Sequence, residues 1–552
     1  MKTKLLQQTF LKGILPLCFF FWSANAFAAN PTFSGQTTAG DYDIVDVASL
    51  QAIATVVNAG TSSNETAKSL KNFTFHQTAN IDMTGQTWIP IGTNDPYKYF
   101  AGTYDGGSFK ISNLTCTRTG SDYSGVFGKL DTGGVLKNII VENVNITGVY
   151  GTGGLVGNVC NNCTIDNCHV TSGTINATAS SQVGGLIGYL KIYTAGTTTI
   201  VKNCHTSVNV NGDSNVGGLI GYFAWGNATA TGTVQDCYAT GNVTAGSTDI
   251  YSGVGGFVGA KDNSGINFTM QRCYATGSVS AKSGTNPVNM GGFIGYAGGS
   301  WSDLEVITNC YATGSVTGTS TSVNVGGFAG CNESSAITNC YATGAITAGG
   351  VTGGFIGSIQ TIGTVNNCVA LSPSISTTGT AVTFGKAIGS NTSSGTSSCY
   401  AWDSMTLPTG TLTGLNGTAV TKQQVNVATN WWNGTIGYFT NPTGIWTLAD
   451  NYLPVLTTAG GTQAGTMPSH LSIGTAVNQP DTDNSFKVSV VDNKLQILSE
   501  GVNSVQIFNA AGKLMLQGVV YTNSFNVASL TSGVYIVKAN TTLGVKMAKV
   551  IK

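Results

Sequence analysis

The chain has 552 residues, of which only 9% are charged and 75 are glycine, and its 24 Lys and Arg balance its 24 Asp and Glu. This balance excludes the basic surface field by which proteins attract nucleic acid or anionic lipid. Low charge combined with 41% hydrophobic residues is also unlike the composition of disordered chains. The composition indicates an ordered, repetitive and β-rich protein, for which we expect no cofactor and no nucleic-acid partner.

Residues 1–28 have the features of a secretory signal peptide. Lys2 and Lys4 begin a basic stretch, an apolar run follows over Gly13 to Trp22, and Ala26 and Ala28 provide small residues for cleavage. The apolar run is too short to remain in a bilayer as a spanning helix, and no later stretch is long and apolar enough. We therefore expect an exported mature chain without a transmembrane segment.

Residues 29–112 predict an N-terminal cap and the opening coils of a larger array. The stretch "SLQAIATVVNAG" from Ser49 to Gly60 places apolar residues on one helical face and ends in glycine. This pattern predicts a short capping helix.

A glycine phrase repeats through residues 113–400. Two glycines, two apolar residues and a further glycine form "GGLVG" at Gly153 to Gly157, "GGLIG" at Gly184 to Gly188 and "GGFIG" ending at Gly357. The copies recur about every thirty residues, and units of this size must stack because each is too small to bury a core alone. Short Val, Ile, Thr and Tyr runs between turn residues indicate strands. We predict an all-β parallel β-solenoid of about ten coils, with a glycine at each tight corner.

A cysteine phrase, "NCYATGSV" from Asn309 and its near-copies, alternates with the glycine phrase. Alternation places the cysteine on one face of a strand and the following tyrosine on the other. Ile139 and Leu114 occupy the same slot in earlier units, which indicates an apolar core position where cysteine acts as a small hydrophobe. Side chains in one column run parallel, which is poor geometry for disulfides. We expect a reduced, buried core ladder made of Cys168, Cys204, Cys237, Cys273, Cys310, Cys340, Cys368 and Cys399.

The tyrosines of the cysteine phrase form the candidate ligand-binding surface. Two interpretations are open: an aromatic column that stabilises the sheet, or a platform on which sugar rings or extended peptides lie. The candidate residues are Tyr238, Tyr274, Tyr311 and Tyr341.

Other reactive side chains are sparse. His169 and His205 follow core-ladder cysteines and are expected to stack on the outside of adjacent coils. Cys160 and Cys163 form a C-x-x-C pair in a turn, for which zinc binding and a local disulfide are the alternatives. With Cys331, they are expected to be the most accessible thiols.

No catalytic residue and no metal site are predicted. Hydrolysis or elimination needs clustered acids, bases or metals. Between Gly151 and Tyr400 the most closely spaced carboxylates are Asp303 and Glu305, which are expected to be a solvated surface pair. No H-E-x-x-H stretch occurs anywhere in the chain.

Three segments follow the array. Residues 401–456 contain "NWWNGTIGYF" and "GIWTLADNYLPVL", whose tryptophans are expected to close the last open coil. Residues 457–484 are turn-rich and predict a flexible linker. Residues 485–552 show short alternating strands and predict a small β-sandwich.

The glycine phrase followed by N-C-Y-A-T-G resembles the GLUG-repeat family of bacterial surface proteins and adhesins, which also occurs beside IgA-specific metallopeptidases. The segments "VQIFNAAGKLMLQ" and "FNVASLTSGVYIVKAN" resemble the C-terminal sorting domain of the type IX secretion system. The first resemblance implies a repeat fold and a surface location. The second implies contact with the type IX machinery and export through the outer membrane.

These observations together predict a non-enzymatic, cell-surface or secreted adhesin-like protein. Its rigid solenoid would bind host or matrix glycans or proteins. The alternatives are a purely structural surface spacer and a carbohydrate-active β-helix enzyme.

Overall fold

The computed structural model describes residues 29–120, 123–177, 181–224, 229–246, 252–262, 267–285, 288–299, 305–320, 322–378, 383–395, 397–409, 414–435, 439, 444–463, 465–473, 488–497, 501–520, 522–542 and 544–552. The predicted signal peptide lies outside the described residues. The chain divides into two compact units. The first comprises Met1–Thr421, Asn430–Leu448 and Pro454–Gly465, and the second comprises Lys422–Thr429, Ala449–Leu453 and Thr466–Lys552.

The N-terminal cap begins with β1 (Asp41–Ile44), α1 (Val47–Asn58), α2 (Glu65–Lys68), β2 (Thr74–Gln77) and β3 (Ile81–Asp82). The capping helix predicted from Ser49 starts two residues earlier, because Asp46 is its N-cap and forms a capping box with Ser49. Its apolar face, which includes Leu50, Ile53 and Val57, is fully buried.

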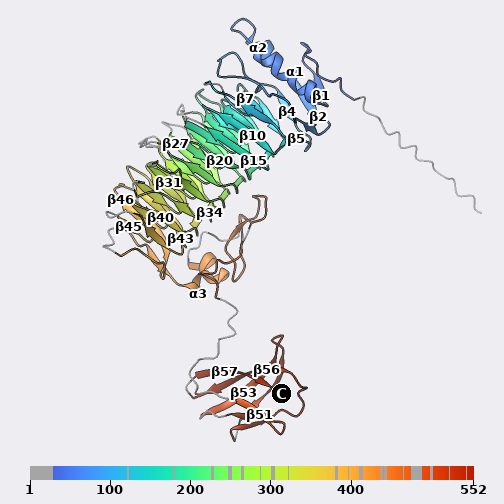
Figure 1. The fold of residues 1–552 in the computed structure, drawn as a ribbon. Coiled ribbons are helices and arrows are strands. Elements are labelled where there is room, and N and C mark those ends of the chain that lie inside the picture. Colours follow the sequence, from blue (N-terminus) through green and yellow to red (C-terminus); the bar gives the residue numbers. More distant parts are fainter. Residues whose placement is uncertain are drawn as a thin grey trace, which may run out of the picture. The chain divides into compact units, whose positions relative to one another are not determined.

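The predicted parallel β-solenoid is confirmed, with about ten coils stacked in register beyond this cap (Figure 1). Each coil contributes short strands to four parallel sheets. The first sheet continues from β1, β2 and β3 and takes two strands from most coils. Its earlier strands in each coil are β4 (Thr103–Asp105), β8 (Val135–Lys137), β13 (Thr164–Asp166), β18 (Thr198–Lys202), β23 (Thr231–Gln235), β28 (Asn267–Gln271), β33 (Glu305–Thr308), β38 (Ser335–Thr338), β43 (Thr364–Ala370), β47 (Ser397–Trp402) and β48 (Thr418–Val420). Its later strands are β5 (Lys110–Ser112), β9 (Ile140–Glu142), β14 (His169–Val170), β19 (His205–Thr206), β24 (Tyr238–Ala239), β29 (Tyr274–Ala275), β34 (Tyr311–Ala312) and β39 (Tyr341–Ala342).

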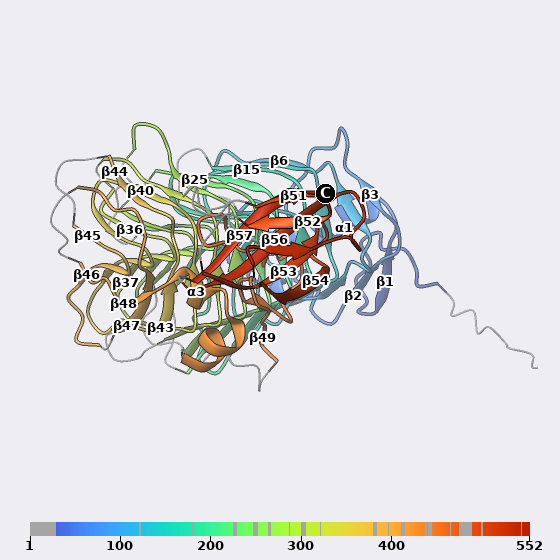
Figure 2. The same cartoon turned by 90° about the horizontal axis from the view of Figure 1, so that it is seen from below.

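The other three sheets take one strand from each coil. The second sheet, whose strands follow one another along one side in Figure 2, contains β6 (Thr115–Thr117), β10 (Val144–Gly148), β15 (Gly173–Ala177), β20 (Asn209–Asn211), β25 (Val243–Ala245), β30 (Val279–Ala281), β35 (Val316–Thr317), β40 (Ile346–Ala348) and β44 (Ile375–Thr377). The third contains β11 (Thr152–Gly153), β16 (Ser181–Gly184), β21 (Ser214–Gly217), β26 (Val254–Gly255), β31 (Asn289–Gly291), β36 (Asn324–Gly326), β41 (Val351–Gly353) and β45 (Phe384–Gly385). The fourth contains β7 (Phe127–Leu130), β12 (Val156–Val159), β17 (Ile187–Lys191), β22 (Ile220–Ala224), β27 (Val258–Asp262), β32 (Ile294–Ala297), β37 (Ala329–Asn332), β42 (Ile356–Ile359) and β46 (Ile388–Asn391).

A left-handed residue precedes seven of the eight cysteines of the core ladder, at a bend in the first sheet. Its φ lies between 53° and 56°, a region that Asn and Asp adopt more readily than other residues with a side chain. The residues in this position are Asn167, Asn203, Asp236, Arg272, Asn309, Asn339 and Asn367. The bend they make turns the cysteine into the core and the next residue outward.

All eight cysteines of the core ladder are buried and have free thiols. The Cys204 thiol donates to the Lys202 carbonyl at 3.0 Å and accepts the Cys168 N–H at 3.4 Å, so the sulfurs also link adjacent coils. Ile139 precedes Cys168 in this column, because Ile140 pairs with His169. The assignment of Leu114 to the same column was wrong: its strand neighbours align it with Val144, one bend further along the coil.

The thiols expected to be accessible are buried as well. Cys160, Cys163 and Cys331 are at most 2% exposed, and all three are free. Burial raises the pKa of Cys163 and of Cys331 to about 12, so both are protonated at neutral pH. The structure therefore contains neither the local disulfide nor a reactive thiolate at these positions.

The glycine phrase brings consecutive coils into close contact. A Cβ placed on Gly185 would lie 2.0 Å from the Gly218 carbonyl oxygen of the next coil, which no other residue could tolerate. The apolar residue after the glycines points into the core. Phe257, Phe293 and Phe328 stack there with ring centroids 4.8 Å apart, an offset arrangement that adds to the burial of each ring.

A buried ion pair interrupts this apolar core. Lys261 and Glu305 form an ion pair between side chains that are 0% and 4% exposed, and Lys261 also donates to the Gly298 carbonyl. One coil earlier, the corresponding corner contains Phe223 against Phe268, with ring centroids 4.4 Å apart. The expected solvated carboxylate pair is wrong for Glu305, whose strand turns it inward, and Asp303 lies outside the described residues.

The solenoid is followed by short elements and by the C-terminal sheets. The short elements are α3 (Lys422–Val425), a π-helix (Ala428–Thr435), β49 (Trp446–Thr447) and β50 (Val455–Leu456). In the second unit, β51 (Val488–Val491), β52 (Lys494–Ile497) and β55 (Ser524–Asn526) form one antiparallel sheet. A second antiparallel sheet contains β53 (Val502–Asn509), β54 (Leu514–Val519), β56 (Val534–Thr541) and β57 (Gly544–Ile551). Leu495, Ile507 and Val537 belong to the core that the two sheets share, as predicted for a small β-sandwich.

Breaking the buried ion pair should destabilise the solenoid strongly. Replacing Lys261 by Met leaves the Glu305 carboxylate buried without its cation, which typically costs about 3–5 kcal/mol. The double variant Lys261→Leu with Glu305→Leu restores an apolar corner and should regain most of that loss. Urea unfolding of the full chain measures both. A Lys261→Met variant as stable as the parent would contradict the burial of the pair.

Candidate binding surface on the aromatic ladder

Six aromatic side chains stack along the outer face of the first sheet, and we call this column the aromatic ladder. The ring centroids of His169 and His205 lie 3.9 Å apart, and those of His205 and Tyr238 lie 4.5 Å apart. The column continues through Tyr274, Tyr311 and Tyr341 at spacings of 4.8 to 4.9 Å, with the tyrosine planes within 4° of parallel. In-register strand pairing imposes this stack, since each ring sits directly beside its counterpart in the next coil.

Stacking determines which part of each ring a ligand can reach. The faces of the inner rings are covered by their neighbours, so the ladder presents ring edges, hydroxyl groups and imidazole nitrogens. A sugar ring that packs flat on an aromatic face has no place on these inner rings. The ladder therefore offers a row of hydrogen-bonding groups and not the flat platform considered from the sequence.

A segment from the end of the array covers half of the ladder. Tyr274, Tyr311 and Tyr341 are only 1%, 3% and 1% exposed. The open tyrosine column expected from the sequence is therefore wrong at these three positions. The physical reason is that residues 444–448 and 454–463, which we call the closing segment, fold back along the outside of the first sheet.

Aromatic residues of this region pack on the covered tyrosines. Trp446 lies 6.0 Å from the Tyr341 ring and donates from its indole to the Asn309 side chain at 3.1 Å. Trp432 and Phe439 also contact the Tyr341 ring. The tryptophans thus cover the side of the sheet, whereas the sequence had suggested the end of the last coil. The segment from Thr457, expected to begin a flexible linker, is likewise bound here: Thr458 donates to Asp236.

The rest of the ladder opens into a pocket of about 280 Å³, which we call the ladder pocket. Its wall is formed by Asn167, His169, Asn203, His205, Asp236, Tyr238, Thr458, Gly460 and Gly461. His169 and His205, singled out as a surface stack, therefore lie in the same site as Tyr238. The other three predicted tyrosines do not line the pocket.

The charge in the ladder pocket is largely neutralised. Arg272 donates to both oxygens of Asp236, each at 2.7 Å, in the bidentate geometry that makes such pairs strong. Asn167 contacts the His169 ring at 3.0 Å, and the Asn203 amide donates to Asp166 at 2.8 Å. The pocket is polar, and its one carboxylate is already paired with a cation.

The two imidazoles are neutral at neutral pH. Burial, with a smaller contribution from the neighbouring His169, lowers the pKa of His205 to about 4. Burial also lowers the pKa of His169. Among the described residues, no group of three or more His, Cys, Asp or Glu is arranged to hold a metal ion.

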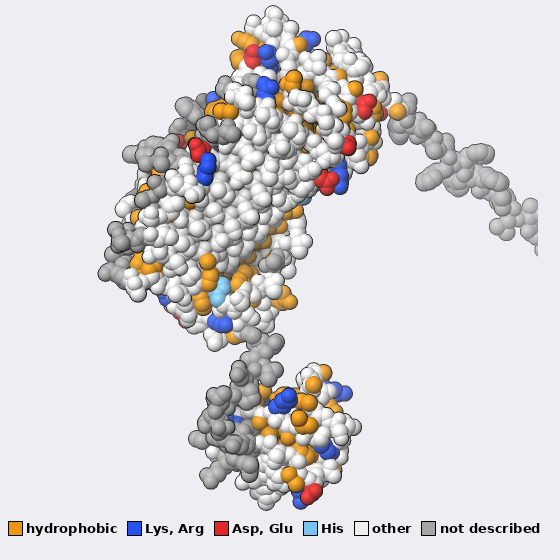
Figure 3. All heavy atoms as spheres, in the orientation of Figure 1, with side chains coloured by type: hydrophobic (Ala, Val, Ile, Leu, Met, Phe, Trp, Pro, Cys, Tyr) orange, Lys and Arg blue, Asp and Glu red, His pale blue; other side chains and the backbone are white. Residues whose placement is uncertain are grey.

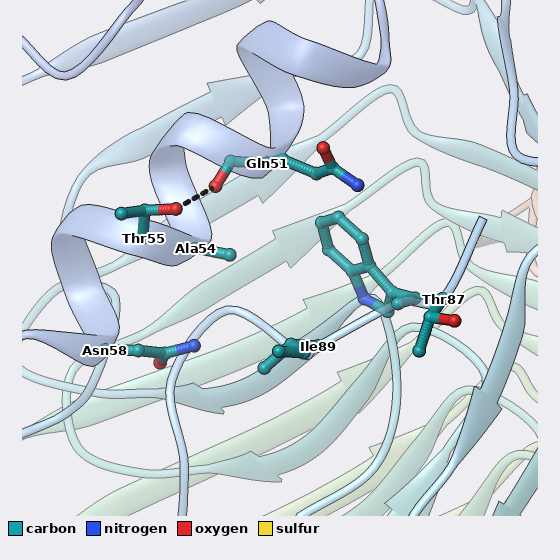
Figure 4. Close-up of a pocket in the computed structure, with 7 residues that line it drawn as sticks. Gln51, Ala54, Thr55, Asn58, Thr87 and Ile89 are labelled. Carbon is teal, nitrogen blue, oxygen red and sulfur yellow. Dashed lines mark hydrogen bonds between the residues drawn. The ribbon is translucent and has the colours of Figure 1, made fainter.

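A second pocket lies between α1 and the segment Thr87–Ile89 (Figure 4). Its polar groups are already used to hold the cap. Thr55 donates to the Gln51 carbonyl at 3.0 Å, and Asn58 bonds the backbone on both sides of Ile91. The Trp88 indole donates to two backbone carbonyls at 3.1 Å. This pocket joins the helix to the opening coils.

The surface of the solenoid carries little charge. In the view of Figure 3, uncharged side chains and backbone cover most of it, and charged side chains are few and scattered. No described helix has the length and hydropathy required to cross a bilayer.

Comparisons with known proteins agree with the repeat pattern. The GLUG motif matches residues 286–317 and 321–347, and the secretion system C-terminal sorting domain matches residues 483–552. The chain therefore contains both the GLUG motif and the sorting domain that its sequence was found to resemble. The sorting domain places it among proteins exported through the type IX secretion system to the cell surface or beyond.

Similar proteins include halomucin of Haloquadratum walsbyi, which is 34% identical over 172 residues, 29% of this chain and 2% of halomucin. A glycine-rich membrane protein provisionally assigned in Evansella cellulosilytica is 35% identical over 17% of this chain and 11% of its own length. The chain thus spans a small fraction of these relatives. A crystal structure from Bacteroides ovatus, provisionally assigned as an immunoglobulin A1 protease, aligns over 78% of this chain and 96% of its own at 18% identity and a TM-score of 0.37.

The half-buried imidazoles should make stability sensitive to acid. The unfolded chain takes up protons on histidine near pH 6.5, whereas the folded chain resists protonation of His205 down to about pH 4. Since the unfolded state binds more protons in this window, stability falls as the pH falls through it. Replacing His205 by Tyr, the residue found at the next ladder position, should reduce the loss in urea-unfolding midpoint between about pH 7 and pH 5. An unchanged loss would show that His205 is protonated in the folded state.

Proposed function

We propose that this exported GLUG-repeat protein is a non-enzymatic adhesin that binds host or matrix glycans or proteins through the ladder pocket. The supporting observation is the incomplete cover of the aromatic ladder. Three of its six residues are buried under the closing segment, while His169, His205 and Tyr238 line a polar pocket. Repeated in-register coils hold these groups on a rigid face, and such preorganisation lowers the entropic cost of binding.

The side chains of the pocket favour binding over catalysis. General acid–base chemistry needs a group free to exchange protons with a substrate. Both oxygens of Asp236 accept hydrogen bonds from Arg272, and the His205 pKa lies about 2.5 below its usual value of about 6.5. These features support a recognition role and disfavour the carbohydrate-active enzyme.

Binding by the secreted protein to arrays of glycans and matrix proteins tests this function. Tyr238→Phe keeps the ring stack and removes one outward hydroxyl, so it should weaken binding roughly fivefold to tenfold, the effect of one hydrogen bond. Tyr97→Phe, at an exposed tyrosine of the N-terminal cap, is the matched control and should bind like the parent.

Two results would contradict the proposal. Absence of binding to every array component would favour the structural spacer, whose repeats provide only length. Equal binding by the parent and by Tyr238→Phe would place the binding surface elsewhere.

Deletion of Ser485 to Lys552 should block surface delivery. Without the sorting domain, the passenger is expected to accumulate in the periplasm, because the type IX machinery no longer recognises it. Immunoblots of periplasmic and surface fractions measure this. Substitution of Ile507 by Asp, which disrupts the buried core of the same domain, should have the same effect, whereas unchanged display of both variants would separate export from this domain.

A further inference from the structure

The covered half of the ladder shows which chemical group its hydroxyls bind. Tyr274 donates to the Gly460 carbonyl at 2.9 Å, Tyr311 donates to the Gln463 side-chain oxygen at 3.1 Å, and Tyr341 donates to the Pro454 carbonyl at 2.7 Å. All three acceptors are uncharged amide oxygens. Three consecutive ladder residues thus bind the same group from one polypeptide segment.

The closing segment approaches the ladder closely where it carries no side chain. A Cβ on Gly461 would lie 2.5 Å from the Tyr274 hydroxyl and 2.6 Å from the Tyr238 ring, and its φ is +84°. Glycine is therefore required at this point, both for the space and for the left-handed backbone. The contact is made by bare peptide backbone against ring edges.

The ladder continues beyond the three covered tyrosines. Tyr238, His205 and His169 extend the column with the same strand register, and all three retain partial exposure. Their edges bear one hydroxyl and two neutral imidazoles, and the side-chain amides of Asn167 and Asn203 lie beside them in the same pocket. Amides, hydroxyls and neutral imidazoles match the donors and acceptors of a peptide backbone.

Charge and shape narrow the partner further. Asp236, the one carboxylate of the pocket, is paired with Arg272, so the site offers no free charge to an ionic ligand. The stacked rings leave the inner faces inaccessible to sugars. The pocket is also continuous with a surface that already binds polypeptide within this chain.

We infer that the ladder pocket binds an extended, uncharged and glycine-containing segment of a partner protein, beside Thr458, Gly460 and Gly461 of the closing segment. The partner's amide oxygens accept hydrogen bonds from Tyr238 and its backbone lies against the imidazole edges. This inference rests on the proposed adhesin function and specifies protein, and not glycan, as the ligand class.

A capped peptide with the sequence of residues 457–465, TTAGGTQAG, is the probe, because this stretch already contacts the ladder. Fluorescence anisotropy with the full secreted protein should show saturable binding at millimolar peptide or below. Tyr238→Phe should weaken binding at least fivefold, Tyr97→Phe should leave it unchanged, and a peptide with both central glycines replaced by valine should not bind. Urea unfolding establishes that Tyr238→Phe is folded.

The outcomes separate this inference from the adhesin function. No binding of the peptide overturns the inference, and so does binding that Tyr238→Phe leaves unaltered. If a neutral N-acetylglucosamine trimer binds in a Tyr238-dependent manner and the peptide does not, the ligand is a glycan, and the adhesin function stands while the inference falls. If the peptide fails and the arrays also show no binding, both fall.

Discussion

The rest of the structure depends on one constraint, the in-register parallel pairing that places each residue beside its counterpart in the next coil. His169 pairs with His205, His205 with Tyr238, and Tyr238 with Tyr274. On the inner face the same constraint produces the core ladder of cysteines, and on the outer face it produces the aromatic ladder. Each column gains from a neighbour of the same kind, since aromatic pairs add about 0.5–1.5 kcal/mol beyond their burial. A motif that repeats in the sequence therefore places the same type of side chain at equivalent positions in successive coils.

Local sequence patterns predicted most of the fold, because strand alternation and repeat spacing are visible within short stretches of the chain. They predicted the solenoid, the capping helix and the C-terminal sandwich, and they placed the tyrosines on the outer face. These local patterns did not predict contacts between segments that are distant in the sequence. The sequence around Tyr311 does not indicate that Gln463, 152 residues away, accepts its hydrogen bond. The tryptophans were the one sequence feature that predicted a covered surface of the solenoid. Glu305 was misjudged for a related reason, because its partner Lys261 belongs to another sheet of the preceding coil.

The proposed binding surface is one ladder with two environments. Its covered part is a hydrogen-bonded interface with the chain's own closing segment, and its open part continues the same column along a polar pocket, with ring spacings of 3.9 and 4.5 Å. Sequence reasoning identified Tyr238 and the histidine pair separately and could not join them, because only the coil register puts them in one column. It also could not show that Arg272, in a left-handed position usually given to Asn, is there to neutralise Asp236.

The closing segment also limits the positions at which repeats can be added to the solenoid or removed from it. Its contacts fall on successive coils, with Pro454 at Tyr341, Gln463 at Tyr311 and Gly460 at Tyr274. An extra repeat inserted between Tyr341 and β47 would move the start of the closing segment away from those partners by one strand spacing, about 4.8 Å. A repeat inserted before His169 would leave every one of these contacts in place. Whole repeats can thus be gained or lost on the N-terminal side of the ladder without disturbing these contacts, so the solenoid can change length without altering the proposed binding surface.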